Sequence, residues 1–198
     1  MTIYNSSILA SDIPEQRLEE MYGDEDYYWY LRSPEFQETF LKPLADCVNN
    51  VEGSTLDVCC GEGQLAQFVE GKYCGFDGSR RAILKAQRRY PVSEYPDKWF
   101  IVRRLEETHS IGDFDFEKIV FGGVLHCLIA PESRVDFIRS FQDLYGATHF
   151  FVYDLERLDT SDLDNEFACV SSYVNEIPSL EHWQRIVTKR KILCYRYE

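Results

Sequence analysis

The residues whose types and spacing point to ligand chemistry are Asp57, Gly61 and Gly63, with Asp77 following about twenty residues after the first. Glycines at a turn between a strand and a helix let the backbone approach a ligand, because no Cβ atom stands in the way. The first turn of the helix presents backbone N–H groups that have no partner within the helix. The segment therefore predicts a small-molecule site at a strand-to-helix turn.

The turn differs from the Gly-x-Gly-x-x-Gly pattern that binds nicotinamide dinucleotides. Cys59 stands at the first glycine position, and Leu65 lies near the third. Asp57 adds a carboxylate at the end of the strand, where it would repel a pyrophosphate and tolerate a cationic ligand. The sequence favours a ligand that carries positive charge.

Asp77 ends the next strand that the sequence predicts, Tyr73–Asp77. At that place a carboxylate can accept hydrogen bonds from both hydroxyls of a ribose, each contributing about 1.5–3 kcal/mol. The alternative is that Asp77 only caps the helix that begins near Arg80. The preceding glycine turn, at this spacing, favours the ribose role.

A third block begins at Phe114 and runs through a strand that ends in Gly122 and Gly123. Small residues at the carboxyl end of a strand leave room for a ligand beside the point where strand order reverses. His126 follows closely and either simply lines the cofactor pocket, which is the favoured interpretation, or acts as a general base.

Together, these blocks resemble the class I S-adenosylmethionine-dependent methyltransferases. Asp57, Gly61 and Gly63 match the acidic residue and the Gly-x-Gly turn of their glycine-rich signature, and Cys59 departs from it where the family usually has glycine. Asp77 matches the ribose-binding acidic residue. The fourth strand of the family often reads Gly-x-Leu-His-x-Leu, which is matched here by Gly123, Leu125, His126 and Leu128. The resemblance covers about half of the chain, from Leu56 to Tyr153.

The resemblance implies S-adenosylmethionine as cofactor and direct methyl transfer as reaction. Arg104 stands where the family often has an aspartate that contacts adenine, so this contact would come from the backbone near Leu105 or from Glu106. The expected cofactor-binding residues are Asp57, Cys59, Gly61, Glu62, Gly63, Asp77, Gly78, Leu105, Glu106, Gly122 and Gly123, with Trp29 and Arg32 from the N-terminal segment.

The N-terminal residues are interpreted from their position and type alone. Trp29 lies in an aromatic run that can stabilise a sulfonium by cation–π attraction, or can simply attach the N-terminal arm to the domain. Arg32 is placed to pair with the carboxylate of the cofactor. His126 is the only candidate catalytic residue, and a general base is needed only if the acceptor atom is protonated when bound.

The elements that must position these residues alternate between strands and helices, which predicts a doubly wound α/β fold with a mostly parallel sheet covered on both faces. We expect residues 1–33 to form an extension or lid and residues 34–198 to form one Rossmann-like domain. Ser33 and Pro34 indicate a helix start, the segment Leu155–Glu166 indicates a loop, and Phe167–Val174 is a candidate partner of the last strand. The expected strands are Thr55–Cys60, Tyr73–Asp77, Trp99–Val102, Lys118–Gly123, Thr148–Asp154 and Lys191–Tyr197, and the helices between them are Gln64–Val69, Arg80–Tyr90, Pro131–Tyr145 and Pro178–Val187.

Composition narrows the class of partner. The net charge of −13 disfavours a nucleic-acid or anionic-membrane surface, because phosphate contacts require clustered lysine and arginine. No segment approaches the roughly 18 apolar residues that span a bilayer, and the N-terminus lacks the pattern of a secretory signal. The seven cysteines include no Cys-x-x-Cys pair, so we expect free thiols, no zinc site and a cytoplasmic location.

These features favour a small-molecule methyl acceptor over a protein or nucleic acid. Two alternatives remain open from the sequence. One is a different chemistry on the same cofactor, and the other is a methyltransferase-like module that binds a partner protein. Cys59, Arg104 and the shortened C-terminal region favour the second alternative mildly, whereas the intact Gly61, Gly63 and Asp77 argue against it.

Overall fold

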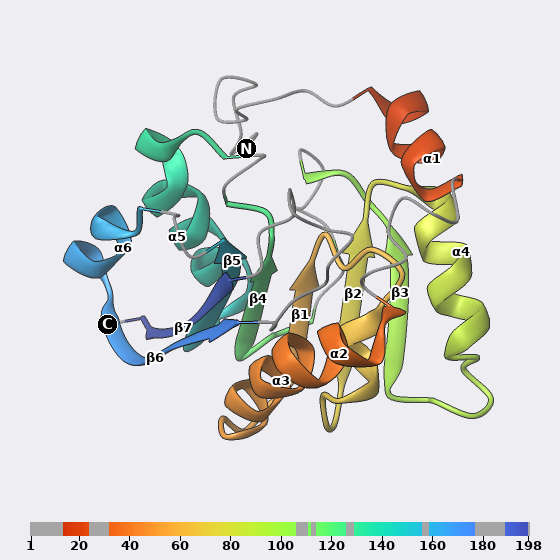
Figure 1. The fold of residues 1–198 in the computed structure, drawn as a ribbon, viewed down its shortest axis with the longest axis horizontal. Helices are drawn as coiled ribbons and strands as arrows, with labels where there is room; N and C mark the ends of the chain where they lie inside the picture. The colour runs from red at the N-terminus through yellow and green to blue at the C-terminus, as the bar shows by residue number, and fades with distance from the viewer. Residues whose placement is uncertain are drawn as a thin grey trace.

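A single seven-stranded sheet organises the protein (Figure 1). The computed structural model describes residues 14–23, 32–105, 111, 114–125, 129–155, 159–176 and 189–197. The strand order is β3-β2-β1-β4-β5-β7-β6. The strands are β1 (Thr55–Val58), β2 (Tyr73–Asp77), β3 (Lys98–Val102), β4 (Lys118–Gly122), β5 (His149–Leu155), β6 (Ala168–Glu176) and β7 (Lys189–Arg196).

Strands β1 to β5 are parallel, and β7 runs antiparallel between β5 and β6. The strand order reverses between β1 and β4, and open α/β sheets bind ligands in a crevice at the carboxyl ends of two such strands. The predicted fold class is confirmed, and the last two strands form a complete antiparallel pair with one irregularity between Cys169 and Ser171.

Helices cover both faces of the sheet, and each face has its own apolar core. In Figure 1 the helices α2 and α3 lie in front of the sheet, where Phe40 and Leu44 are buried. On the other face α5 buries Phe137 and Phe141. The helical elements are α1 (Glu15–Gly23), α2 (Pro34–Phe36), η3 (Gln37–Leu41), α3 (Lys42–Asn49), η4 (Gln64–Gln67), α4 (Arg80–Arg89), η6 (Pro131–Ser133), α5 (Arg134–Tyr145) and α6 (Ser161–Glu166).

Local signals fix several helix ends where the sequence predicts them. The hydroxyl of Ser33 accepts a hydrogen bond from the backbone N–H of Phe36 at 3.1 Å, which caps the helix that begins at Pro34. Gly146 ends α5 in the left-handed conformation, with φ of 66°. None of the helices among the described residues is long and apolar enough to cross a bilayer.

Two expectations are corrected by the structure. The segment predicted as a loop at Leu155–Glu166 contains α6, because Asp159 accepts from the backbone N–H of Ser161 and Leu163 is fully buried. The helix predicted after the glycine turn is a single 3-10 turn, η4. The helix predicted at Pro178–Val187 lies outside the described residues.

Candidate functional site

The glycine turn that follows β1 closes tightly at the crevice. The backbone N–H of Cys60 donates to the carbonyl of Phe76 at 2.9 Å, and that of Gly63 donates to the carbonyl of Cys60 at 3.0 Å. Gly61 and Gly63 have φ of 56° and 70°, a conformation that favours glycine. A Cβ atom on Gly63 would lie 2.6 Å from the ring of Phe100. The turn therefore requires glycine for both conformation and space.

Cys59 has a φ of 58°, and it is the only non-glycine with positive φ among the described residues. A left-handed conformation costs a non-glycine residue about 1–2 kcal/mol. The cysteine at position 59 therefore costs folding free energy that a glycine would not cost. The turn keeps its shape with a strained residue at a candidate ligand site.

We expect Cys59→Gly to be more stable than Cys59→Ala by about 1 kcal/mol, because both variants lose the thiol but only glycine relieves the positive φ. Urea unfolding of the two variants side by side measures the difference. Equal free energies of unfolding would show that the residue at 59 is not strained.

The carboxylate of Asp77 lies against the glycine turn. Its Oδ2 accepts from the backbone N–H of Gly61 at 3.0 Å, and its Oδ1 accepts from that of Ser79 at 2.8 Å. The helix α4 is capped instead by the hydroxyl of Ser79, which accepts from the N–H of Ala82 at 3.2 Å. Burial raises the pKa of Asp77 to about 6, although the hydrogen bonds that its carboxylate accepts from Gly61 and Ser79 oppose this rise.

Asp57 is buried beneath the turn and accepts a hydrogen bond from the hydroxyl of Tyr73. Burial raises the pKa of Asp57 to about 7, with a further contribution from the charge of Asp77, although the bond from Tyr73 lowers it. A raised pKa means that folding favours the protonated, neutral form of the carboxyl group. A positive charge nearby would favour the ionised form instead and lower the pKa. The site thus holds two carboxyl groups that a cationic ligand would stabilise.

The raised pKa of Asp57 predicts a stability that depends on pH. The folded pKa lies above the unfolded value, so the contribution to the free energy of unfolding is largest below about pH 4 and is lost as the pH rises through about 7. We expect Asp57→Asn to unfold at a higher temperature than the unmodified protein at about pH 8, with no such gain at about pH 4. Thermal unfolding across this range measures the difference, and a gain that is the same at every pH would contradict it.

Glu62 and Arg32, both expected at the cofactor, are bound to each other. Glu62 is 2% exposed and accepts from Arg32 Nη2 at 2.6 Å and from Lys85 Nζ at 2.9 Å, while Arg89 Nη2 lies 3.9 Å away. Burial would raise the pKa of Glu62, but the bonds from Arg32 and Lys85 outweigh it and lower the pKa. This cluster joins the glycine turn to α4 and to the segment before α2. A direct contact of Arg32 with the cofactor stays a prediction.

The remaining candidates lie around the same end of the sheet. A Cβ atom on Gly122, the last residue of β4, would meet nothing within 4 Å, so open space adjoins the crevice. Gly123 has φ of 70° and donates to the carbonyl of Tyr153 at 2.7 Å. Gly78 follows Asp77 directly, and Leu105 is buried beyond the end of β3. The predictions for Trp29, Glu106 and His126 fall outside the described residues.

Sequence reasoning missed two residues at the site. Tyr22, on α1, lies against Asp77, and Tyr73 lies against Asp57. Tyr73 occupies a predicted strand and signals only an apolar core position. Tyr22 lies 55 residues before its partner, and nothing in the local pattern of a single sequence indicates so distant a contact.

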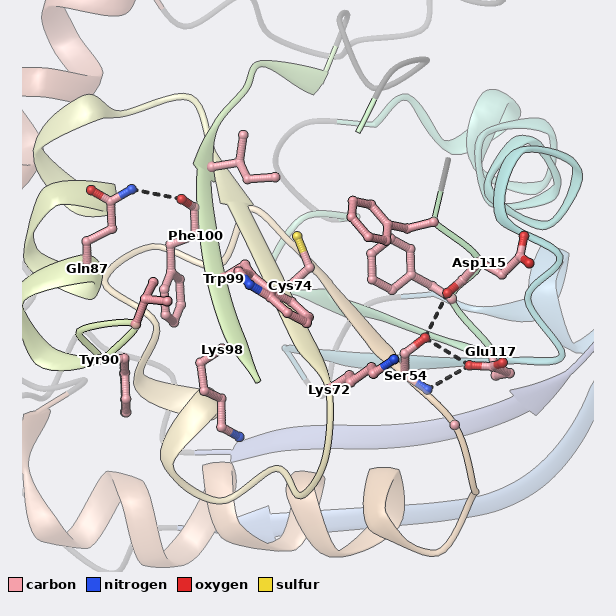
Figure 2. A pocket seen from close by; sticks show the side chains of 15 residues that line it. Ser54, Lys72, Cys74, Gln87, Tyr90, Lys98, Trp99, Phe100, Asp115 and Glu117 are labelled. Atoms are coloured by element: carbon pink, nitrogen blue, oxygen red, sulfur yellow. Dashed lines mark hydrogen bonds between the residues drawn. The ribbon is translucent and has the colours of Figure 1, made fainter. Parts of the chain in front are cut away.

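A separate open pocket of about 930 Å³ lies away from this site (Figure 2). Ser54, Lys72 and Glu117 line it at the amino-terminal ends of the strands, and Trp99 and Cys74 line it along the face. The glycine turn and Asp77 are at the opposite, carboxyl ends. The candidate cofactor site is therefore defined by the strand ends and not by this pocket.

Comparison with known proteins finds likeness in structure and not in sequence. No family model matches the chain, and no curated protein matches its sequence. The structure is similar to magnesium protoporphyrin IX methyltransferase from Synechocystis PCC 6803, with a TM-score of 0.65 and 15% identity over 95% of this chain and 99% of that one. It is also similar to the N-methyltransferase NodS from Bradyrhizobium japonicum WM9, with a TM-score of 0.68 and 17% identity over 92% and 97% of the two chains.

The chain has the class I methyltransferase fold. The two similar structures were determined with S-adenosylmethionine and with S-adenosyl-L-homocysteine bound, respectively. A third similar structure is the plantazolicin methyltransferase BpumL in complex with S-adenosylhomocysteine, with a TM-score of 0.55 and 11% identity over 93% and 95% of the chains. The predicted resemblance is thus confirmed as a class I methyltransferase fold that spans nearly the whole chain.

Proposed function

We propose that this chain is an S-adenosylmethionine-dependent methyltransferase that acts on a small-molecule acceptor. One observation carries the proposal: the Asp77 carboxylate and the Gly61 backbone meet at 3.0 Å, at the carboxyl ends of the strands where the sheet order reverses. This is the place at which open α/β sheets bind ligands. The three similar methyltransferases support the choice of cofactor.

The residues present fit this cofactor. The left-handed Gly61 and Gly63 shape the turn that would receive the amino-acid part, with Cys59 and Glu62 in the same turn. Asp77 and the adjoining Gly78 would receive the ribose, and Leu105 would lie at the adenine. The buried carboxyl of Asp57 suits a ligand that carries an ammonium and a sulfonium.

S-Adenosylmethionine supplies a methyl group on a sulfonium, which is already a good leaving group. The chain therefore has to align the acceptor and keep water out, and alignment alone can supply about 7–11 kcal/mol of the barrier. Gly122 leaves space for an acceptor at the end of β4, and Gly123 follows it with a φ of 70°. His126 remains our proposal for a base where the acceptor atom needs one. Trp29, Arg32 and Glu106 remain proposed cofactor contacts.

The acceptor class rests on charge and on the similar structures. The net charge of −13 disfavours a large cationic surface for nucleic acid. Two of the similar proteins are named for acceptors that are not nucleic acids, magnesium protoporphyrin IX and plantazolicin. The free cysteines among the described residues agree with the reducing cytoplasm that we propose as location.

Calorimetric titration with S-adenosylmethionine and with S-adenosylhomocysteine tests the proposal. We expect dissociation constants in the micromolar range, about −8 kcal/mol of binding free energy. A methyl donor with a labelled methyl group then identifies the acceptor in a screen of small molecules. No binding of either ligand to folded protein freed of carried-over cofactor would reject the proposal and favour an interaction module.

A further inference from the structure

The helix α1 lies across the carboxylate that we assign to the ribose. Figure 1 shows α1 beside α4 at the carboxyl ends of the strands. The hydroxyl of Tyr22, near the end of α1, donates to Asp77 Oδ2 at 3.5 Å. The same hydroxyl oxygen lies 3.1 Å from the position of a Cβ atom on Gly61. With α1 in this place, Asp77 is only 4% exposed.

Hydrogen-bond donors of the protein itself already occupy most of the acceptor positions of the Asp77 carboxylate. A carboxylate offers about four lone-pair positions. Ser79 N–H uses one on Oδ1, and Gly61 N–H and the Tyr22 hydroxyl use two on Oδ2. A ribose brings two hydroxyl donors that engage both oxygens, so one of the present donors must leave Oδ2. The contact of Tyr22 is the longest of the three and is the one that yields.

Polar contacts at the start of α4 hold α1 in position. The carboxylate of Glu19 accepts from the backbone N–H of Arg80 at 2.6 Å and of Arg81 at 3.2 Å. Lys85 Nζ donates to the carbonyl of Tyr22 at 2.8 Å. The contacts of Glu19 are exposed to solvent, and exposed hydrogen bonds open at low free-energy cost. The contacts of Glu19 are therefore the part of this attachment that opens most easily, since the contact of Lys85 is partly buried.

We propose that α1 is a gate on the cofactor site, in which Tyr22 occupies the place of a ribose hydroxyl on Asp77 until the cofactor displaces it. Glu19 sets the stability of the closed position. The closed fraction lowers the apparent affinity, because only the open form binds. This inference rests on the proposed function, since it concerns the binding of the same cofactor.

Stopped-flow binding of S-adenosylhomocysteine to the full chain tests the gate. Loss of a capping carboxylate favours the open form by about twofold to thirtyfold. Glu19→Ala is therefore expected to raise the association rate constant by that factor, to leave the dissociation rate constant unchanged and to tighten binding accordingly. Tyr22→Phe is expected to raise the association rate constant and to tighten binding as well, each by a smaller factor.

Glu20→Ala is the matched control, because Glu20 neighbours Glu19 on α1 but bonds only with Gln16 of the same helix in the described contacts, at 2.9 Å. An unchanged association rate in Glu19→Ala, or weaker binding, overturns the gate. Hydrogen exchange of the unmodified protein gives a second measurement. The amides of Arg80 and Arg81 should exchange faster when S-adenosylhomocysteine is bound, and slower exchange would overturn the gate as well. Failure of the unmodified protein to bind at all would instead reject the proposed function.

Discussion

Asp77→Asn is expected to weaken the binding of S-adenosylmethionine by about a hundredfold to ten-thousandfold, because two charge-assisted hydrogen bonds of about 1.5–3 kcal/mol each are lost. The amide offers one oxygen acceptor where the carboxylate offers two, and its NH₂ group faces a ribose that also donates. Asp77→Ala should abolish binding while the protein stays folded.

Calorimetric titration measures this loss, and thermal unfolding shows whether the variant stays folded. Some loss of stability is expected, since Asp77 also accepts from Gly61 N–H and Ser79 N–H. Asp136→Asn is a matched control, because Asp136 lies exposed on α5 away from the glycine turn. An Asp77→Asn variant with unchanged affinity would remove Asp77 from the cofactor site.

The parallel part of the sheet could be predicted because its strands are short apolar runs bounded by turn residues. The strand Tyr73–Asp77 is found with the predicted bounds, and every residue of it is buried. The strand Thr55–Val58 ends two residues before the prediction, because Cys59 leaves the extended conformation with a φ of 58°. The glycine turn and Asp77 could be placed together because parallel strands end at one edge of the sheet.

Contacts between segments far apart in the chain could not be predicted. Nothing in the sequence around Glu62 indicates that it pairs with three cationic side chains. Arg32, Lys85 and Arg89 come from different turns and elements. From the sequence, a glutamate in a glycine turn is interpreted as a residue that contacts the ligand. Only the fold brings the three cations within reach, and a buried carboxylate then requires them.

The glycine turn is where local preference and the fold disagree. Cysteine rarely adopts the left-handed conformation, yet the turn imposes this conformation on Cys59. Natural sequences violate local rules mainly at functional or strained sites. The disagreement at Cys59 therefore supports the turn as a site for a ligand more than it argues for a site that has decayed.

The strongest test of the turn is Gly63→Ala, for which the chain contains its own control. Gly63 and Gly71 have nearly the same φ, 70° and 71°, so alanine is equally strained at both. A Cβ on Gly63 would lie 2.6 Å from the ring of Phe100, whereas a Cβ on Gly71 would meet nothing within 4 Å. We expect Gly71→Ala to cost about 1–2 kcal/mol and Gly63→Ala to cost a further 1–3 kcal/mol or so for overpacking.

Urea unfolding of both variants separates the conformational cost from the steric one. A double-mutant cycle with Phe100→Leu then assigns the steric part, because a shorter side chain at 100 removes the ring atom that the new Cβ would meet. We expect Gly63→Ala to cost at least about 1 kcal/mol less in the Phe100→Leu background than alone. A coupling energy near zero would mean that the ring moves aside freely, and the requirement for glycine at 63 would then come from its backbone conformation and not from the packing of β3 against the turn.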